Sequence, residues 1–182
     1  MQPIPQPGSS IALDEISPRA GNDVIASARE LLLEYGRHIV SQPGSAQFCF
    51  GALEHEAKHL PAGYIDQGGG CILARVGGQP AGFIAWRSVA PKVEARAWEM
   101  KRLWVRPLAR GLGLGRTLTE AVLQRARAAN QNAIYLDTVP ATMAAAYLMY
   151  IDMGFLPCSA YNDNSMEGIM FLRLPLNDSL AH

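Results

Sequence analysis

The sequence predicts a single α/β (α+β) domain in which helices cover both faces of a mixed, twisted sheet of about six or seven strands. Its 182 residues suit one domain, and 49% apolar and 18% charged residues is an ordinary globular composition. Two segments with helical periodicity come first, three β-prone segments follow, and helix and strand patterns then alternate. No linker divides the chain, so we expect one domain over residues 10–182.

Local patterns predict each element in turn. Residues 1–9 hold three prolines and predict a flexible arm, and the alternation in residues 10–16 predicts a short strand. Apolar residues at helical spacing after Asp23 predict a long helix; Pro61 ends a second helix, and Gly154 stops the last one. In chain order we expect a strand at 10–16, helices at about 23–41 and 46–60, strands at 70–76, 81–87 and 95–105, a helix from the glycine-rich turn at 110–115 to about 129, a strand at 133–139, a helix at 141–153, and strands at about 155–160 and 168–174.

Charge is distributed unevenly along a chain whose net charge is zero. Residues 92–127 contain nine basic and three acidic residues, which gives this stretch +6 and the rest of the chain −6. A zero net charge argues against a general affinity for nucleic acid. The basic stretch indicates either a compact anionic ligand or a solvated helix face.

Compartment is indicated by what the sequence lacks. Three cysteines are too few, and odd in number, for a disulfide framework. The first ten residues have neither the basic start nor the apolar stretch of a signal peptide. No apolar run approaches the roughly 20 residues that cross a bilayer. We therefore expect a cytoplasmic protein that does not associate with membranes.

A glycine-rich turn at 110–115 lies between an expected strand and an expected helix. Glycines let a backbone approach a ligand closely, and the first N–H groups of a helix bind anions, so this turn could cradle a phosphate. A plain loop with a glycine cap is the alternative. The dinucleotide fingerprint is excluded because Arg116 stands where it needs glycine, and the Gly-Lys-Ser/Thr of the P-loop is absent.

The turn reads Arg-x-x-Gly-x-Gly from Arg110 to Gly115 and follows the segment Met100–Pro107. Downstream, Tyr150 precedes Gly154-Phe155 in a Tyr-x-x-x-Gly-Phe pattern. Together these motifs resemble the GNAT superfamily of acyl-CoA-dependent N-acetyltransferases over about residues 99–155. The resemblance implies a GNAT-type fold and transfer of an acetyl group from acetyl-CoA to an amine in a direct ternary complex. One departure is Met143, at a position where the family often has an asparagine that assists cofactor contacts.

The resemblance also implies roles for residues. Glu99 would accept the proton of the amine, often through water, and Tyr150 would protonate the leaving thiolate. The alternatives are a strand carboxylate paired with Lys101 or Arg102, and a core aromatic. Arg102 and Arg106 are weaker candidates for phosphate contacts than Arg110 and Arg116, and the alternative for both is a solvated side chain. The expected cofactor-binding residues are Leu103, Trp104, Val105, Arg110, Gly111, Leu112, Gly113, Leu114, Gly115 and Arg116.

A rival motif is His55-Glu56-Ala57-Lys58-His59, which matches the H-E-x-x-H of zinc hydrolases. A third ligand is missing, because the metzincin extension needs glycine at 62 and histidine at 65, where Ala62 and Ile65 stand. Lys58 would also place a positive charge between the two imidazoles. We expect no metal, and a surface helix is the preferred interpretation.

Two further matters stay open in the sequence. The first is a non-catalytic module of the same fold that binds acyl-CoA and senses a metabolite. The second is the acceptor, which the resemblance restricts to a small-molecule or peptide amine. The segment from Tyr161 to Gly168 either borders its pocket or is a plain turn. The resemblance also implies that the domain can pair into a homodimer.

Overall fold

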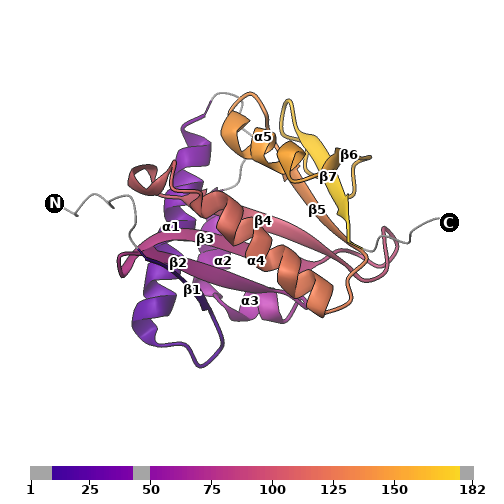
Figure 1. The fold of residues 1–182 in the computed structure, drawn as a ribbon. Helices are drawn as coiled ribbons and strands as arrows, with labels where there is room; N and C mark the ends of the chain where they lie inside the picture. Colours follow the sequence, from indigo (N-terminus) through magenta and orange to yellow (C-terminus); the bar gives the residue numbers. More distant parts are fainter. Residues whose placement is uncertain (1–9, 43–49, 177–182) are drawn as a thin grey trace.

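A seven-stranded sheet forms the middle layer of the molecule (Figure 1). The computed structural model describes residues 10–42 and 50–176. The strands lie in the order β1-β2-β3-β4-β5-β7-β6, and only the β4–β5 pair is parallel. The strands are β1 Ile11–Glu15, β2 Gly70–Val76, β3 Gln79–Ser88, β4 Ala97–Val105, β5 Ala133–Thr138, β6 Leu156–Pro157 and β7 Met170–Pro175.

Helices cover both faces of this sheet (Figure 1). One face, the α1 face, packs apolar side chains such as Leu31 and Leu53 against Phe83 of the sheet. The other, the α4 face, packs Leu118 against Ile84. The expected fold class is thereby confirmed. The α1 face carries α1 Asn22–Val40, α2 Phe50–Lys58 and α3 Ala62–Ile65; the α4 face carries α4 Leu114–Ala128 and α5 Ala144–Asp152, and a short 3-10 turn η2 occupies Pro107–Ala109.

Most element boundaries lie within two residues of those expected, but two elements are shorter. The strand expected at 155–160 is only Leu156–Pro157, followed by one more hydrogen bond to β7, from the N–H of Cys158 to the carbonyl of Phe171 at 2.9 Å. The helix expected at 141–153 begins at Ala144 because the N–H groups of Thr142 and Met143 both bond to the carbonyl of Val139 in a preceding turn. The short helix α3 is not predicted by the sequence. The expected arm at 1–9, and the part of the second helix before Phe50, lie outside the described residues.

The strands β4 and β5 separate soon after they meet. Their pairing runs only from Ala97 beside Ala133 to Glu99 beside Tyr135. Beyond Glu99 the edge of β4 that faces β5 has no strand partner. We call the resulting gap, between β4 from Met100 onward and β5 from Leu136 onward, the seam. It leaves backbone groups in the middle of the sheet available to a ligand.

A β-bulge in β4 controls which side chains border the seam. Ala85 pairs with Lys101 and Phe83 pairs with Trp104, so β4 has one residue more than β3 in this interval. Arg102 within the bulge has a φ of 60°. A bulge interrupts the alternation of side chains along a strand. Lys101, Arg102 and Trp104 consequently all contact groups on the α1 face.

Candidate active site

Three adjoining cavities follow the seam. The turn cavity, of about 470 Å³, is lined by the last residues of β4, the glycine-rich turn and the start of α5. The seam cavity, of about 50 Å³, is lined by residues of β4 and β5 together with Tyr150. The loop cavity, of about 360 Å³, lies between Arg87 and the segment 162–169. Tyr35 and Met143 line all three, so the cavities meet at these two side chains.

The glycine-rich turn has the backbone of an anion site. Gly111 and Gly113 have φ values of 79° and 75°, which glycine adopts readily and other residues rarely adopt. An added Cβ at either glycine would meet no atom within 4 Å. Gly113 caps α4 without any side-chain hydrogen bond, so the first N–H groups of α4 need another acceptor. These groups lie at the wall of the turn cavity, where a phosphate could accept them.

The two arginines expected near a phosphate both line the turn cavity. Arg110 donates from Nε to the carbonyl of Val105 at 3.1 Å, and its guanidinium lies 5.1 Å from the ring centre of Trp104. Arg116 forms an ion pair with Asp152, and both side chains are substantially exposed. A phosphate would therefore have to share these guanidinium groups with protein acceptors.

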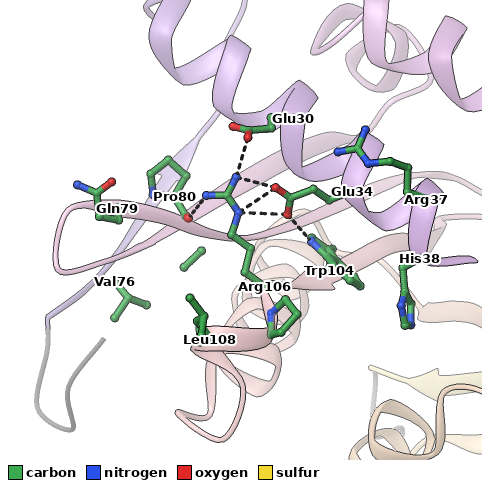
Figure 2. A pocket seen from close by; sticks show the side chains of 13 residues that line it. Glu30, Glu34, Arg37, His38, Val76, Gln79, Pro80, Trp104, Arg106 and Leu108 are labelled. Carbon is green, nitrogen blue, oxygen red and sulfur yellow. Dashed lines mark hydrogen bonds and ion pairs between the residues drawn. The ribbon is translucent and has the colours of Figure 1, made fainter. Parts of the chain in front are cut away.

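A further cavity, of about 470 Å³, is shown in Figure 2 and shares His38, Trp104 and Ala109 with the turn cavity as lining residues. Its centre is the guanidinium of Arg106, which donates to both oxygens of Glu34 at 2.7–3.1 Å and to the carbonyl of Pro80 at 2.9 Å. Glu30 lies 3.2 Å from the same guanidinium. Trp104 donates to Glu34 at 3.1 Å. Arg106 thus fixes the end of β4 against α1, and it is neither solvated nor directed at a phosphate.

Tyr150 of α5 is buried, with only 6% of its surface exposed, and lines the seam cavity. Its hydroxyl has no hydrogen-bond partner in the described part of the chain, where every fully buried side-chain N or O atom has one, so the hydroxyl opens into this cavity. Burial, and then the charges of Tyr35 and Asp137, raise the pKa of the phenol. Tyr150 is therefore protonated at neutral pH and faces the seam as a donor.

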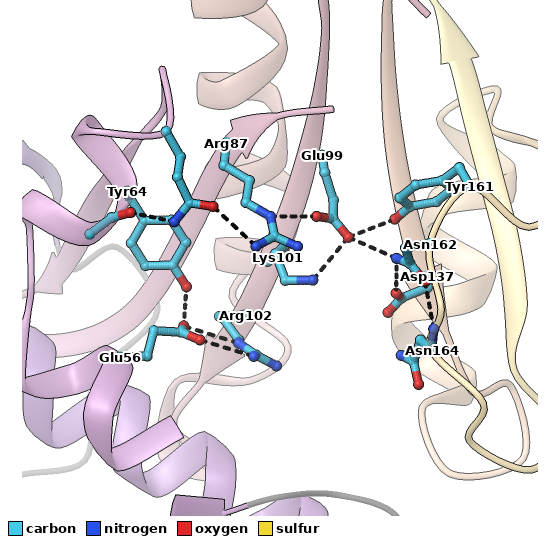
Figure 3. Close-up of polar contacts among 12 residues, drawn as sticks. Glu56, Tyr64, Arg87, Glu99, Lys101, Arg102, Asp137, Tyr161, Asn162 and Asn164 are labelled. Atoms are coloured by element: carbon cyan, nitrogen blue, oxygen red, sulfur yellow. Dashed lines mark hydrogen bonds and ion pairs between the residues drawn. The ribbon is translucent and has the colours of Figure 1, made fainter. Parts of the chain in front are cut away.

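Glu99 is the centre of the polar network in Figure 3. Only 3% of its surface is exposed. One oxygen accepts from Arg87 at 2.7 Å, and the other accepts from Lys101 at 2.9 Å, Tyr161 at 3.0 Å and Asn162 at 3.1 Å. Burial disfavours its charge, but Lys101 and Arg87 together outweigh burial and hold its pKa below the ordinary value of a glutamate. The network keeps Glu99 ionised and occupies both of its oxygens.

Side chains of the H-E-x-x-H segment form hydrogen bonds within the protein. Glu56 accepts two hydrogen bonds from Arg102 at 3.0 and 3.1 Å and one from Tyr64 (Figure 3). His59 Nδ1 lies 2.7 Å from the carbonyl of His55. Within residues 10–42 and 50–176, no three histidine, cysteine or acidic side chains are grouped so as to hold a metal ion. The pairing with Glu56 also shows that Arg102 is not a solvated side chain.

Sequence reasoning missed several residues that border the seam. The sequence does not point to Asp137, Tyr35 or Asn162 individually, although Asn162 lies in the segment 161–168, which it predicts either to border the acceptor pocket or to form a plain turn. Residues 162–164 and Glu167 of that segment do line the loop cavity. The sequence does hold one signal for Asp137: it is an acidic residue near the end of β5, two residues before Val139.

Family and structure comparisons agree with this architecture. A model of the acetyltransferase (GNAT) family matches residues 29–155. N-acetyltransferase 8F1 of Mus musculus is 29% identical over 127 residues, which cover 69% of this chain and 56% of that protein. N-acetyltransferase 8B of the same organism is 32% identical, covering 69% of this chain and 54% of that protein. The chain spans about half the length of such curated relatives.

Solved structures show the same fold at low identity. An acetyltransferase of the GNAT family from Staphylococcus aureus superimposes with a TM-score of 0.71 at 18% identity, covering 92% of this chain and 100% of that one. A protein from Salmonella typhimurium, solved with its cofactor acetyl-CoA, gives a TM-score of 0.64 at 15% identity and covers 94% and 96% of the two chains. None of the helices in the part of the chain described here has the length and apolar character to cross a membrane.

Proposed function

Because the chain belongs to the GNAT acetyltransferase family, we propose that it transfers the acetyl group of acetyl-CoA directly to a primary amine, in a ternary complex. The observation that carries the proposal is the course of the three cavities. The turn cavity is lined by helix N–H groups that could bind an anion, the seam cavity by the phenol of Tyr150, and the loop cavity offers room for a second substrate. Two substrates could thus meet inside the seam without a covalent enzyme intermediate.

The cofactor would lie along the turn cavity. The pyrophosphate fits the first N–H groups of α4 and the backbone at Gly111 and Gly113, because both glycines have positive φ and open space where a Cβ would stand. Arg110 and Arg116 would add charge-assisted hydrogen bonds. The backbone of Leu103–Val105, at the edge of β4 that has no strand partner, would bind the pantetheine arm and the developing oxyanion.

Tyr150 would donate its proton to the thiolate of CoA as the thioester breaks. The hydroxyl opens into the seam cavity and its raised pKa keeps it protonated. A proton acceptor for the amine is needed at the opposite side of the seam. Glu99 is the residue predicted from the sequence, and the loop cavity runs along Arg87 and Lys101, which hold it.

The acceptor would enter through the loop cavity as a small molecule or the end of a peptide. Asp163 and Glu167 lie on one wall of this cavity, and Arg87, Lys101 and Arg102 on another. Glu99 and Glu56 neutralise two of these three positive charges, which leaves one, whereas the carboxylates of Asp137, Asp163 and Glu167 bring three negative charges to the same cavity. This excess of negative charge favours an amine-bearing acceptor. The cytoplasmic location and the homodimer stay predictions.

The test is a melting curve of the purified protein with acetyl-CoA, with the CoA analogue that lacks the 3′-phosphate, and with zinc. A ligand present at about 100 times its Kd should raise the unfolding free energy by about 2.7 kcal/mol. A higher melting temperature with acetyl-CoA but not with zinc supports cofactor binding, and an unchanged melting temperature with acetyl-CoA contradicts the proposal. If acetyl-CoA raises the melting temperature but no amine is acetylated, the non-catalytic sensor is favoured. If zinc alone raises the melting temperature, the hydrolase is favoured.

A further inference from the structure

A second carboxylate stands at the opening of the seam. Glu99 of β4 lies beside Tyr135 of β5, and the next residues on the same faces of the two strands are Lys101 and Asp137. Asp137 thus occupies the first position on the α1 face at which β4 and β5 no longer pair. It lines both the seam cavity, which contains Tyr150, and the loop cavity.

The carboxylates of Glu99 and Asp137 differ in whether an oxygen is left without a hydrogen-bond partner among the described residues. Both oxygens of Glu99 are occupied by four donors. Asp137 accepts one hydrogen bond on Oδ2, from Asn162 Nδ2 at 2.9 Å, and its Oδ1 has no hydrogen-bond partner among the described residues. The same Nδ2 donates to Glu99 at 3.1 Å, so one amide orients both carboxyl groups (Figure 3). A proton acceptor needs a lone pair that substrate can reach, and Asp137 is the one that has it.

Asp137 also faces the group expected to act as the acid. Both side chains line the seam cavity, and the charge of Asp137 adds to the burial that raises the pKa of Tyr150, as it does for Tyr35 of α1 and for Tyr161. The other charged side chains that line its cavities are Lys101 and Arg102 of β4, Arg87 of β3, and Asp163 and Glu167 of the loop. Lys101, Arg102 and Arg87 are each paired with Glu99 or Glu56.

We propose that Asp137, rather than Glu99, accepts the proton of the attacking amine, an inference that rests on the proposed acetyltransferase function. The acceptor enters as an ammonium ion and loses one proton to solvent. The neutral nitrogen forms a bond to the thioester carbon, and the C–S bond breaks. The second amine proton goes to Asp137 while the phenol proton of Tyr150 goes to the thiolate. Transfer of a proton from Asp137 to the phenolate then restores both residues.

Four proteins test this: the wild type, Asp137→Asn, Glu99→Gln and Asp66→Asn. Asp66 is an exposed aspartate beyond α3 that lines none of these cavities, so Asp66→Asn is the matched control. CoA release is followed with a thiol reagent, using L-phenylalanine, tyramine, spermidine and a short peptide with a free α-amine. The fastest acceptor is then used for pH profiles, and acetyl-CoA affinity is measured by calorimetry.

We expect Asp137→Asn to lower kcat by about 10²–10⁴-fold, the usual effect of a lost general base, with the Kd of acetyl-CoA changed less than about twofold. The amine gives every variant an acidic limb in the kcat/KM profile, and a titrating base makes that limb steeper, so Glu99→Gln should keep the wild-type slope and Asp66→Asn should match the wild type. Asp137→Asn activity within about threefold of wild type, or a shallower acidic limb in Glu99→Gln, would overturn the role of Asp137 alone. A wild type that binds acetyl-CoA and acetylates none of these amines overturns the proposed function and this role with it.

Discussion

The substitution Glu99→Gln tests whether the polar network at the seam stabilises the fold. Glutamine keeps the shape of the side chain, but it replaces one acceptor oxygen by an NH₂ group that faces donors. Lys101, with 16% of its side chain exposed, would lose its ion pair inside the protein, whereas Arg87, at 35%, can turn to water. Breaking a buried pair costs about 3–5 kcal/mol, and we expect the lower end, about 3 kcal/mol.

The assay is thermal unfolding at several pH values. For a chain of this size each kcal/mol shifts Tm by about 2–4 °C, so Glu99→Gln should melt about 6–12 °C below the wild type at pH 7. Because the pKa of Glu99 is lowered in the folded state, its stabilisation is present above the unfolded value of about 4.3 and is lost as pH falls through the folded pKa. The Tm difference should therefore narrow below about pH 4.3.

The matched control is Glu54→Gln, the same chemical change at an exposed residue of α2. It should leave Tm within about 1 °C, as surface substitutions usually do. If Glu99→Gln melts within about 2 °C of the wild type at pH 7, or if the difference grows on acidification, the stabilising role assigned to the Glu99 network is refuted.

Three other substitutions probe the site. Gly113→Ala places a Cβ at a φ of 75° and should cost about 1 kcal/mol and weaken acetyl-CoA binding, whereas Gly78→Ala, at a φ of 79° in the β2–β3 turn, should carry the same strain and leave binding intact; calorimetry compares them. Tyr150→Phe should lower kcat by about 10²-fold with acetyl-CoA affinity unchanged, and equal losses of both would contradict its role as acid. Glu34→Gln should cost about 2 kcal/mol in urea unfolding, because Arg106 loses its charged acceptor; no change in the midpoint would count against that contact.

Local signals were enough to predict the fold and part of the candidate site. The strand, the glycine-rich turn and the helix around Gly113 follow one another directly in the chain, so local sequence patterns predict them, and the structure has them where expected. The spacing from Tyr150 to Gly154 indicates Tyr150 as a site residue, and its phenol does open into the seam cavity.

Pairings between distant segments could not be predicted. The basic stretch at 92–127 indicated an anionic ligand, yet Arg102 and Arg106 are neutralised by Glu56 and Glu34, which lie 46 and 72 residues earlier in the chain. No periodicity shows which acid will meet which base across a folded sheet. The hydrogen bonds around Glu99 could not be predicted from the sequence for the same reason, since two of the donors come from the loop more than 60 residues later.

Because of the bulge in β4, the number of residues in this strand determines which side chains border the candidate site. Its extra residue at Arg102 shifts the phase of every side chain that follows relative to β3. Deleting that residue would turn Trp104 away from Glu34, remove this contact between α1 and the end of β4, and change which side chains border the seam. When this protein is compared or recombined with its relatives, a one-residue gap in this strand is therefore a larger change than most substitutions, and exchanged segments should carry β4 as one uninterrupted piece.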